Sequence, residues 1–133
     1  MTPVTVPITV QRWAPYLYAP FAIRGLDMAA ATFAMHVRQY RDAAGSPLIS
    51  LTGQAAGTEG VSCVYATENA YSTSLITIQI NEATIEAVLP FPGSGVKAGA
   101  SVELVYDLQI TGGGLPKTRW FQGAFTIEPG ATQ

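Results

Sequence analysis

The sequence predicts an all-β protein: an antiparallel immunoglobulin-like β-sandwich of about seven to eight strands with one short helix near residues 82–89. Two observations carry this prediction. Apolar and polar residues alternate with a period of two along most of the chain, as in TFAMHVRQY at 32–40, which is the pattern of half-buried strands. Turn-forming residues recur about every ten positions, a spacing typical of sandwiches. A partly closed barrel is the alternative, whereas the lack of crossover helices between strands excludes a parallel α/β fold.

A length of 133 residues predicts a single domain, 1–133. Its first two β-rich segments, at 3–10 and 16–23, contain prolines. Proline lacks the N–H that a sheet ladder needs, so we expect these segments at sheet edges or strand starts. Residues 1–20 are a candidate extended N-terminal segment. Alternation and β-branched content predict further strands at 32–40, 48–52, 61–67, 75–80, 101–110 and 118–129.

The stretch NEATIEAVLP at 81–90 breaks this period, because its apolar residues recur at helical spacing. Asn81 is the predicted N-cap, and Pro90 follows the last turn. Glu82 and Glu86 lie four residues apart and share a helix face. We interpret them as favourable partners of the positive end of the helix dipole. One helix of about two turns is therefore predicted.

Three glycines precede a Lys-Thr pair in DLQITGGGLPKTRW, which raises the question of a phosphate-binding loop. Such a loop reads G-x-x-x-x-G-K-[ST] and needs a glycine immediately before the lysine. Here Pro116 precedes Lys117, and proline removes both a backbone donor and flexibility. The glycines also lie between two predicted strands. We therefore interpret Gly112–Gly114 as the positive-φ turn of a β-hairpin.

The composition favours assembly with other chains. The chain is 48% hydrophobic and only 12% charged, about half the usual charged share of ~25%, and contiguous apolar surface usually marks a contact site. We expect a homo-oligomer; the alternative is a well-packed monomer with a Ser/Thr/Gly-rich surface. The net charge is −2 and the cationic residues are scattered singly, which excludes a nucleic-acid partner. No apolar run approaches the ~20 residues that span a bilayer, and no secretory signal is recognisable, so no membrane partner is expected.

No cluster of residues with catalytic or metal-binding chemistry is evident. His36 is the only histidine and Cys63 the only cysteine, so neither a histidine-rich metal site nor an internal disulfide is expected. His36 falls on the polar face of its strand as a solvated or interface side chain, and Cys63 is interpreted as a small buried hydrophobe. Glu103 and Asp107 share a strand face as solvated groups. We expect no enzyme activity, no cofactor and no metal.

Residues 13–21, WAPYLYAPF, combine four aromatic side chains with two prolines. Aromatic residues dominate binding hot spots, and proline keeps a segment extended at low entropic cost. The candidate interface is therefore Trp13, Tyr16, Tyr18 and Phe21. The alternative is that these side chains pack in the core of a bent first strand, with the prolines at its bends.

Several short motifs follow one another in a characteristic order from about residue 20 onward. A G-x-D motif precedes an alternating strand that ends in Arg38, and a turn, a β-rich run and a glycine hairpin follow. The motifs are G-x-D at 25–27, FAMHVR at 33–38, D-x-x-G-x-P-L at 42–48, S-x-I-x-I-x-I at 74–80, AVLP at 87–90, Y-D-L-x-I at 106–110, and the later Gly123 and Thr132.

In this order and spacing the chain resembles a loose family of small β-sandwich virion proteins of tailed bacteriophages and prophages. These are similar to the N-terminal domains of baseplate upper proteins and to tail-fibre adaptors. The resemblance implies a structural component of the tail, baseplate or neck, made in the host cytoplasm and assembled into the virion. Its partners would be other virion proteins, with a host surface glycan reached through a partner fibre. The alternatives are a capsid decoration protein and a carbohydrate- or receptor-binding module whose aromatics stack on a ligand.

Overall fold

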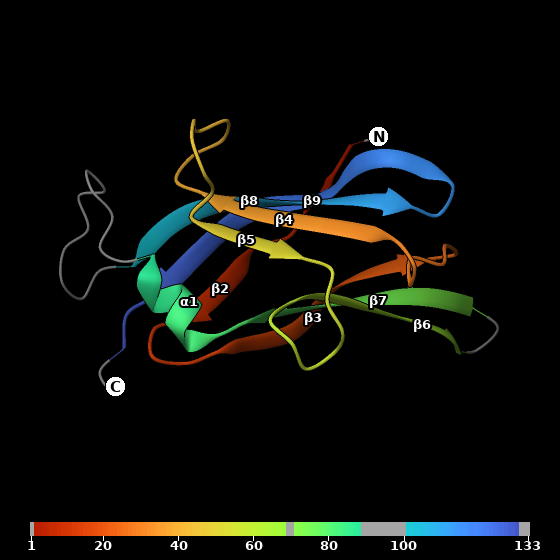
Figure 1. The fold of residues 1–133 in the computed structure, drawn as a ribbon, viewed down its shortest axis with the longest axis horizontal. Coiled ribbons are helices and arrows are strands. Elements are labelled where there is room, and N and C mark those ends of the chain that lie inside the picture. Colours follow the sequence, from red (N-terminus) through yellow and green to blue (C-terminus); the bar gives the residue numbers. More distant parts are fainter. Residues whose placement is uncertain (1, 69–70, 89–100, 131–133) are drawn as a thin grey trace.

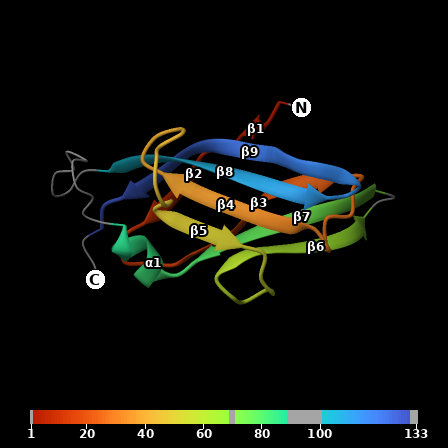
Figure 2. The ribbon, with the colours of Figure 1, turned by 45° about the horizontal axis from the view of Figure 1, so that its top comes forward.

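A computed structural model describes residues 2–68, 71–88 and 101–130. It contains nine strands and one short helix, α1 (Glu82–Ala87), arranged as two β-sheets that pack face to face (Figure 1; Figure 2). The predicted all-β sandwich is thereby confirmed. One sheet is built from β1 (Val4–Thr5), β2 (Ile8–Gln11), β4 (Thr32–Arg38), β5 (Ile49–Thr52), β8 (Val102–Gly112) and β9 (Leu115–Glu128). The other is built from β3 (Tyr16–Arg24), β6 (Gly60–Glu68) and β7 (Tyr71–Ile80).

The larger sheet has the order β1-β9-β8-β4-β5, with β2 also paired to β9, and the smaller sheet has the order β3-β7-β6. All pairs between named strands are antiparallel except those of β1 and β2, which run parallel to β9. The strands outnumber the expected seven to eight because the segment at 3–10 is interrupted at Val6 and Pro7. Each of its halves pairs separately with β9. They lie at the edge of the sheet, where proline is tolerated.

The core lies between the two sheets and is filled by the inward-facing side chain of every second residue. Phe21 of the smaller sheet stacks on Phe121 of the larger one, with 4.3 Å between ring centroids. Tyr106, also buried, donates its hydroxyl proton to the carbonyl of Val6. Burial raises the pKa of Tyr106. The aromatic rings therefore connect the two layers to each other and to the N-terminal segment.

The β3 strand contains an irregularity that changes which of its residues face the core. Its pairing with β7 shifts register between Tyr18 and Phe21. Such a bulge inserts an extra residue and reverses the alternation that follows. As a result Tyr16 and Phe21, five positions apart, are both buried. Strict alternation along the sequence would place them on opposite faces.

Buried Ser74 anchors the turn that follows β3. Its hydroxyl donates to the carbonyl of Leu26 at 2.6 Å and accepts from the N–H of Met28 at 2.9 Å. In this turn Gly25 has φ of +87°, and the Asp27 carboxylate accepts a backbone N–H two residues later at 3.0 Å. The G-x-D motif thus supplies the positive φ and the side-chain acceptor that the turn needs.

The hairpin predicted around the three glycines is confirmed, but Gly112 is part of the ladder and is not one of the residues with positive φ. Gly112 pairs with Leu115 across the β8–β9 ladder, leaving Gly113 and Gly114 as a two-residue turn with φ of +61° and +80°. Positive φ at both central residues is what a type I′ turn requires. The glycines therefore reverse the chain and form no phosphate-binding loop between a strand and a helix.

The helix begins where predicted but is capped differently. The Asn81 side chain makes no capping hydrogen bond. Instead the Glu59 carboxylate, from the loop before β6, accepts the Asn81 N–H at 2.6 Å and the Thr84 hydroxyl at 2.7 Å. Ile85 and Val88 face the core, and Val88 is the C-cap, so α1 is shorter than the predicted 82–89. Leu89, Pro90 and the loop that follows lie outside the described residues.

The interpretation of Glu86 as a partner of the helix N-terminus is wrong, because Glu86 lies at the other end of α1 and pairs with Arg12. The Arg12 Nη2 lies 2.7 Å from the Glu86 carboxylate, which also accepts the Trp13 N–H at 3.2 Å. These hydrogen bonds lower the pKa of Glu86. Trp13 has φ of +67° and its ring lies 4.5 Å from the Arg12 guanidinium. The carboxylate thus fixes the tight turn between β2 and β3.

Replacing this carboxylate by an amide, Glu86→Gln, is expected to lower the free energy of unfolding by about 1 kcal/mol at neutral pH. Charge-assisted hydrogen bonds contribute roughly 1.5–3 kcal/mol. We expect a smaller loss here because both side chains are partly exposed and solvent screens their interaction. The pKa is depressed in the folded state, so the stabilisation is present above the unfolded value of roughly 4.3 and is lost as pH falls through the folded value. Urea unfolding should show the two proteins converging in acid. Glu82→Gln, on the same helix, is the matched control; an equal loss there would contradict the assignment.

Candidate functional site

The structure divides the candidate interface residues rather than bringing them together. Phe21 and Tyr16 are buried, at 1% and 8% exposure, and belong to the core. Trp13 is half-buried in the turn before β3. Only Tyr18, 65% exposed, presents its ring to solvent, next to that of Tyr16 at 5.0 Å. The core-packing alternative therefore describes Phe21 and Tyr16, and an aromatic contact surface at this segment is reduced to Tyr18 with part of Trp13.

The outer face of the smaller sheet is almost without charge, and it carries exposed apolar side chains beside the uncharged polar side chains of Thr73, Thr77 and Gln79. Ala22, Leu75 and Val64 stand opposite one another on its three strands, and Leu75 and Val64 are 45% and 57% exposed. Arg24 and Glu68, each the last residue of its strand, are the only charged residues in the sequences of these strands. An uncharged surface of this kind is typical of a contact face.

The β6 strand forms an open edge of the same sheet. The start of this strand is covered, because Gln54 donates its backbone N–H to the carbonyl of Val61 at 2.8 Å. The Val61 backbone therefore faces away from β7, and by alternation so do the N–H and C=O groups of Cys63, Tyr65 and Thr67. No backbone partner on this side is found for these three residues within the described parts of the chain. The edge also lacks proline, lysine and bulges, the usual protections against pairing.

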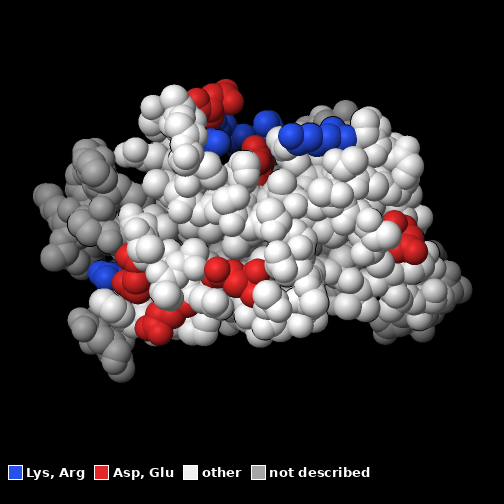
Figure 3. Space-filling view, in the orientation of Figure 1, with Lys and Arg blue, Asp and Glu red and all other residues white. Residues whose placement is uncertain are grey.

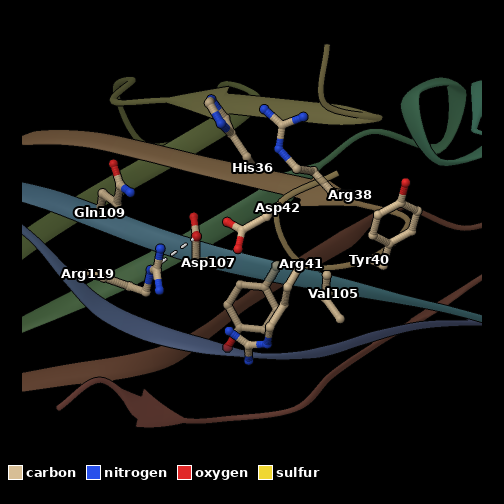
Figure 4. A pocket seen from close by; sticks show the side chains of 10 residues that line it. His36, Arg38, Tyr40, Arg41, Asp42, Val105, Asp107, Gln109 and Arg119 are labelled. Carbon is tan, nitrogen blue, oxygen red and sulfur yellow. Dashed lines mark ion pairs between the residues drawn. The ribbon is translucent and has the colours of Figure 1, made fainter. Parts of the chain in front are cut away.

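A polar pocket of about 260 Å³ lies on the larger sheet, between β4, β8, β9 and the loop at 39–48. Figure 4 shows that its side chains come from the three strands and the loop. Three of the chain's five arginines line it, together with the only histidine, two carboxylates, an amide and the exposed ring of Tyr40. In Figure 3 the positive side chains of the visible face gather mainly at the upper rim, over this region. The polar lining residues are His36, Arg38, Arg41, Asp42, Asp107, Gln109 and Arg119.

Each arginine of the pocket is held by one of its nitrogens. Arg38 Nη1 donates to the carbonyls of Ala43 at 3.1 Å and Gly45 at 2.7 Å, which fixes the loop after β4. Arg41 Nη1 donates to the Gln122 side chain at 2.9 Å. Arg119 Nε lies 3.2 Å from an Asp107 oxygen. The guanidinium groups are therefore oriented by the protein, and each keeps further N–H groups that these contacts do not use.

The loop that forms one wall depends on two residues with positive φ. Asp42 has φ of +58° and Gly45 has φ of +88°, and aspartate tolerates this conformation better than most residues. Arg38, the last residue of β4, donates to the carbonyls of Ala43 and Gly45. The arginine therefore holds the D-x-x-G motif in this conformation. Their common role is to place Tyr40, Arg41 and Asp42 beside the sheet.

The sequence predicts that His36 lies on the polar face of its strand and that Asp107 is solvated, but it does not predict that they lie side by side. His36 pairs with Asp107 across β4 and β8, and Asp107 pairs with Gln122 across β8 and β9. β4 is far from β8 and β9 in the sequence, and only the register of β4 against β8 brings His36 to the residues of the hairpin. The sequence signal for this cluster is the alternation of each strand, which places each of these residues on the polar face.

The described residues show no constellation for catalysis or metal binding beyond this pocket. No group of three or more His, Cys, Asp or Glu among them is placed to hold a metal ion. Cys63 packs partly against the core, and burial raises the pKa of its thiol, which opposes formation of a reactive thiolate. Across the part of the chain that the structure describes, no helix has the length and apolar character needed to cross a bilayer.

Comparison with protein families finds no family model that matches this chain, and comparison with curated proteins finds no significant relative.

Proposed function

We propose that this chain is a non-enzymatic assembly protein that joins other chains through its smaller sheet, in the virion of a tailed bacteriophage. The observation that carries the proposal is the unprotected edge of β6 beside a nearly uncharged, partly apolar face. Such an edge offers backbone donors and acceptors to a further strand, while the face offers apolar area to be buried. The ordered motifs from residue 25 onward support the phage setting, in the tail, baseplate or neck. A capsid decoration protein would use the same contacts.

A second copy of the chain is the partner that this edge fits most directly. Two β6 strands can pair antiparallel about a two-fold axis, because the same donors and acceptors are then presented by each copy. The result is one continuous sheet that joins the two sandwiches, with the exposed apolar side chains of Val64 and Leu75 brought together on its outer face. The low charge of these strands removes the repulsion that would otherwise oppose this contact.

Blocking the edge is expected to abolish self-assembly without unfolding the protein. The Tyr65 N–H faces away from β7, so Tyr65→Pro removes a donor of the open edge while leaving the β6–β7 hydrogen bonds intact. Light scattering should give a defined oligomer for the wild-type chain and a monomer for Tyr65→Pro, with equal circular dichroism spectra.

The matched control is Tyr65→Ala, which loses the same side chain but keeps the N–H and should remain oligomeric. A wild-type chain that is monomeric at high concentration, or a Tyr65→Pro variant that stays oligomeric, would contradict self-assembly through β6. Val64→Lys, compared with Leu115→Lys at the exposed hairpin, tests the contribution of the apolar face separately.

A further inference from the structure

We propose that the pocket between β4, β8, β9 and the 39–48 loop binds an acidic sugar, a single hexuronate-type ring with one carboxylate and several hydroxyl groups. This inference does not depend on assembly through the smaller sheet, because the pocket lies on the outer face of the other sheet. It gives a specific ligand class to the carbohydrate-binding alternative raised by the sequence.

The charge of the pocket selects a singly charged anion. Arg38, Arg41 and Arg119 line the pocket together with Asp42 and Asp107, which leaves an excess of one positive charge there on a chain whose net charge is −2. A guanidinium group matches a carboxylate with two parallel hydrogen bonds. A phosphate group or a nucleotide carries more negative charge and would be repelled by the two aspartates. The balance therefore favours a carboxylate over a phosphate.

The guanidinium groups are also held in place before any ligand arrives. Arg38 is bound to two loop carbonyls, Arg41 to Gln122 and Arg119 to Asp107. Side chains that are already ordered lose less conformational entropy on binding. Each arginine retains N–H groups that these contacts do not use. This arrangement distinguishes the pocket from a surface with mobile basic side chains.

The rest of the lining suits hydroxyl groups and a sugar ring. No described hydrogen bond occupies the Asp42 carboxylate, and His36 and Gln109 add further polar atoms. Tyr40, 61% exposed, offers an apolar ring face for the C–H groups of a sugar. The volume of about 260 Å³ is smaller than the roughly 300–1,000 Å³ of sites for drug-sized ligands, so it fits one ring. A simple anion would need none of these features.

The test is an NMR titration of the full-length protein with galacturonate, galactose and acetate at fixed ionic strength. Galacturonate should bind with a Kd of about 1 mM or lower, and galactose and acetate should each bind at least tenfold more weakly. Arg119→Gln should weaken galacturonate binding tenfold or more. This variant should fold, because the Arg119–Asp107 pair is partly exposed and such pairs contribute little stability.

Lys117→Gln is the matched control, since it removes the same charge from the same strand two residues away and does not line the pocket. Its galacturonate affinity should equal that of the wild type. An equal loss in both variants would overturn the proposal, because it would indicate only long-range attraction. Binding of acetate as tight as galacturonate, or tighter binding of an acidic peptide such as Gly-Asp-Gly-Glu, would also overturn it. The proposal would also be overturned if galactose bound saturably and as tightly as galacturonate.

Discussion

Truncating Phe21 is expected to destabilise the protein by about 3–5 kcal/mol, the range seen when large aromatic side chains are removed from cores. Phe21 is 1% exposed and stacks on Phe121, so Phe21→Ala loses both apolar burial and an inter-sheet contact. Small domains have only about 5–15 kcal/mol of total stability, so the variant should unfold at much lower urea concentration. Equilibrium unfolding monitored by tryptophan fluorescence measures the difference.

The control for this prediction is Tyr18→Ala. Tyr18 belongs to the same strand but is 65% exposed, and its main contact is the ring of Tyr16. A loss below about 1 kcal/mol is expected there. If Phe21→Ala instead changed the oligomeric state and left the unfolding midpoint in place, Phe21 would be an interface residue after all, and the described core would be contradicted.

Adding one methyl group at Gly123 is the second substitution with a large expected effect, about 2–3 kcal/mol of destabilisation. A Cβ at this position would lie 2.6 Å from the carbonyl oxygen of Val6 and 3.0 Å from its carbonyl carbon. These are backbone atoms of the neighbouring segment, which is bound at this point by the 2.9 Å hydrogen bond from Val6 N–H to the Gln122 carbonyl. Gly123→Ala should therefore loosen β1 and β2 from β9.

Hydrogen exchange of the N-terminal strands, together with urea unfolding, measures this effect. Gly114→Ala is the control, because its φ of +80° is strained for alanine but no atom lies within 4 Å of the added Cβ. It should cost about 1 kcal/mol from backbone strain alone. Full stability of Gly123→Ala, with unchanged exchange at Val4 and Thr5, would mean that the N-terminal segment does not dock on β9 as described.

The sequence predicted the elements that depend on local chemistry. Alternation located the strands, and glycines at positive φ located the β8–β9 hairpin, because both signals are properties of neighbouring residues. The same reasoning failed within β3. Strict alternation assigns Tyr16 and Phe21 to opposite faces, whereas the bulge between Tyr18 and Phe21 puts them on the same one. A bulge is set by pairing with β7, which a single strand does not reveal.

Contacts between distant segments were beyond the sequence for the same reason. Glu59 caps the helix in place of Asn81 because the loop before β6 reaches the start of α1. Glu86 was assigned to the helix dipole because its partner Arg12 lies in the first turn of the chain. The pocket required the register of β4 against β8, two strands more than sixty residues apart. For Glu86, His36 and Asp107 the sequence indicates a polar side chain but not its partner.

The parallel pairing of the first strands with the last one has a mechanical consequence. Tension applied between the two ends of the described chain pulls β1 and β2 along their length in one direction and β9 in the other. The ladder from Val4–Phe121 to Gln11–Glu128 is then loaded in shear, so its hydrogen bonds, which lie across the strands, share the force instead of opening one after another. A sandwich connected in this way resists extension through its termini.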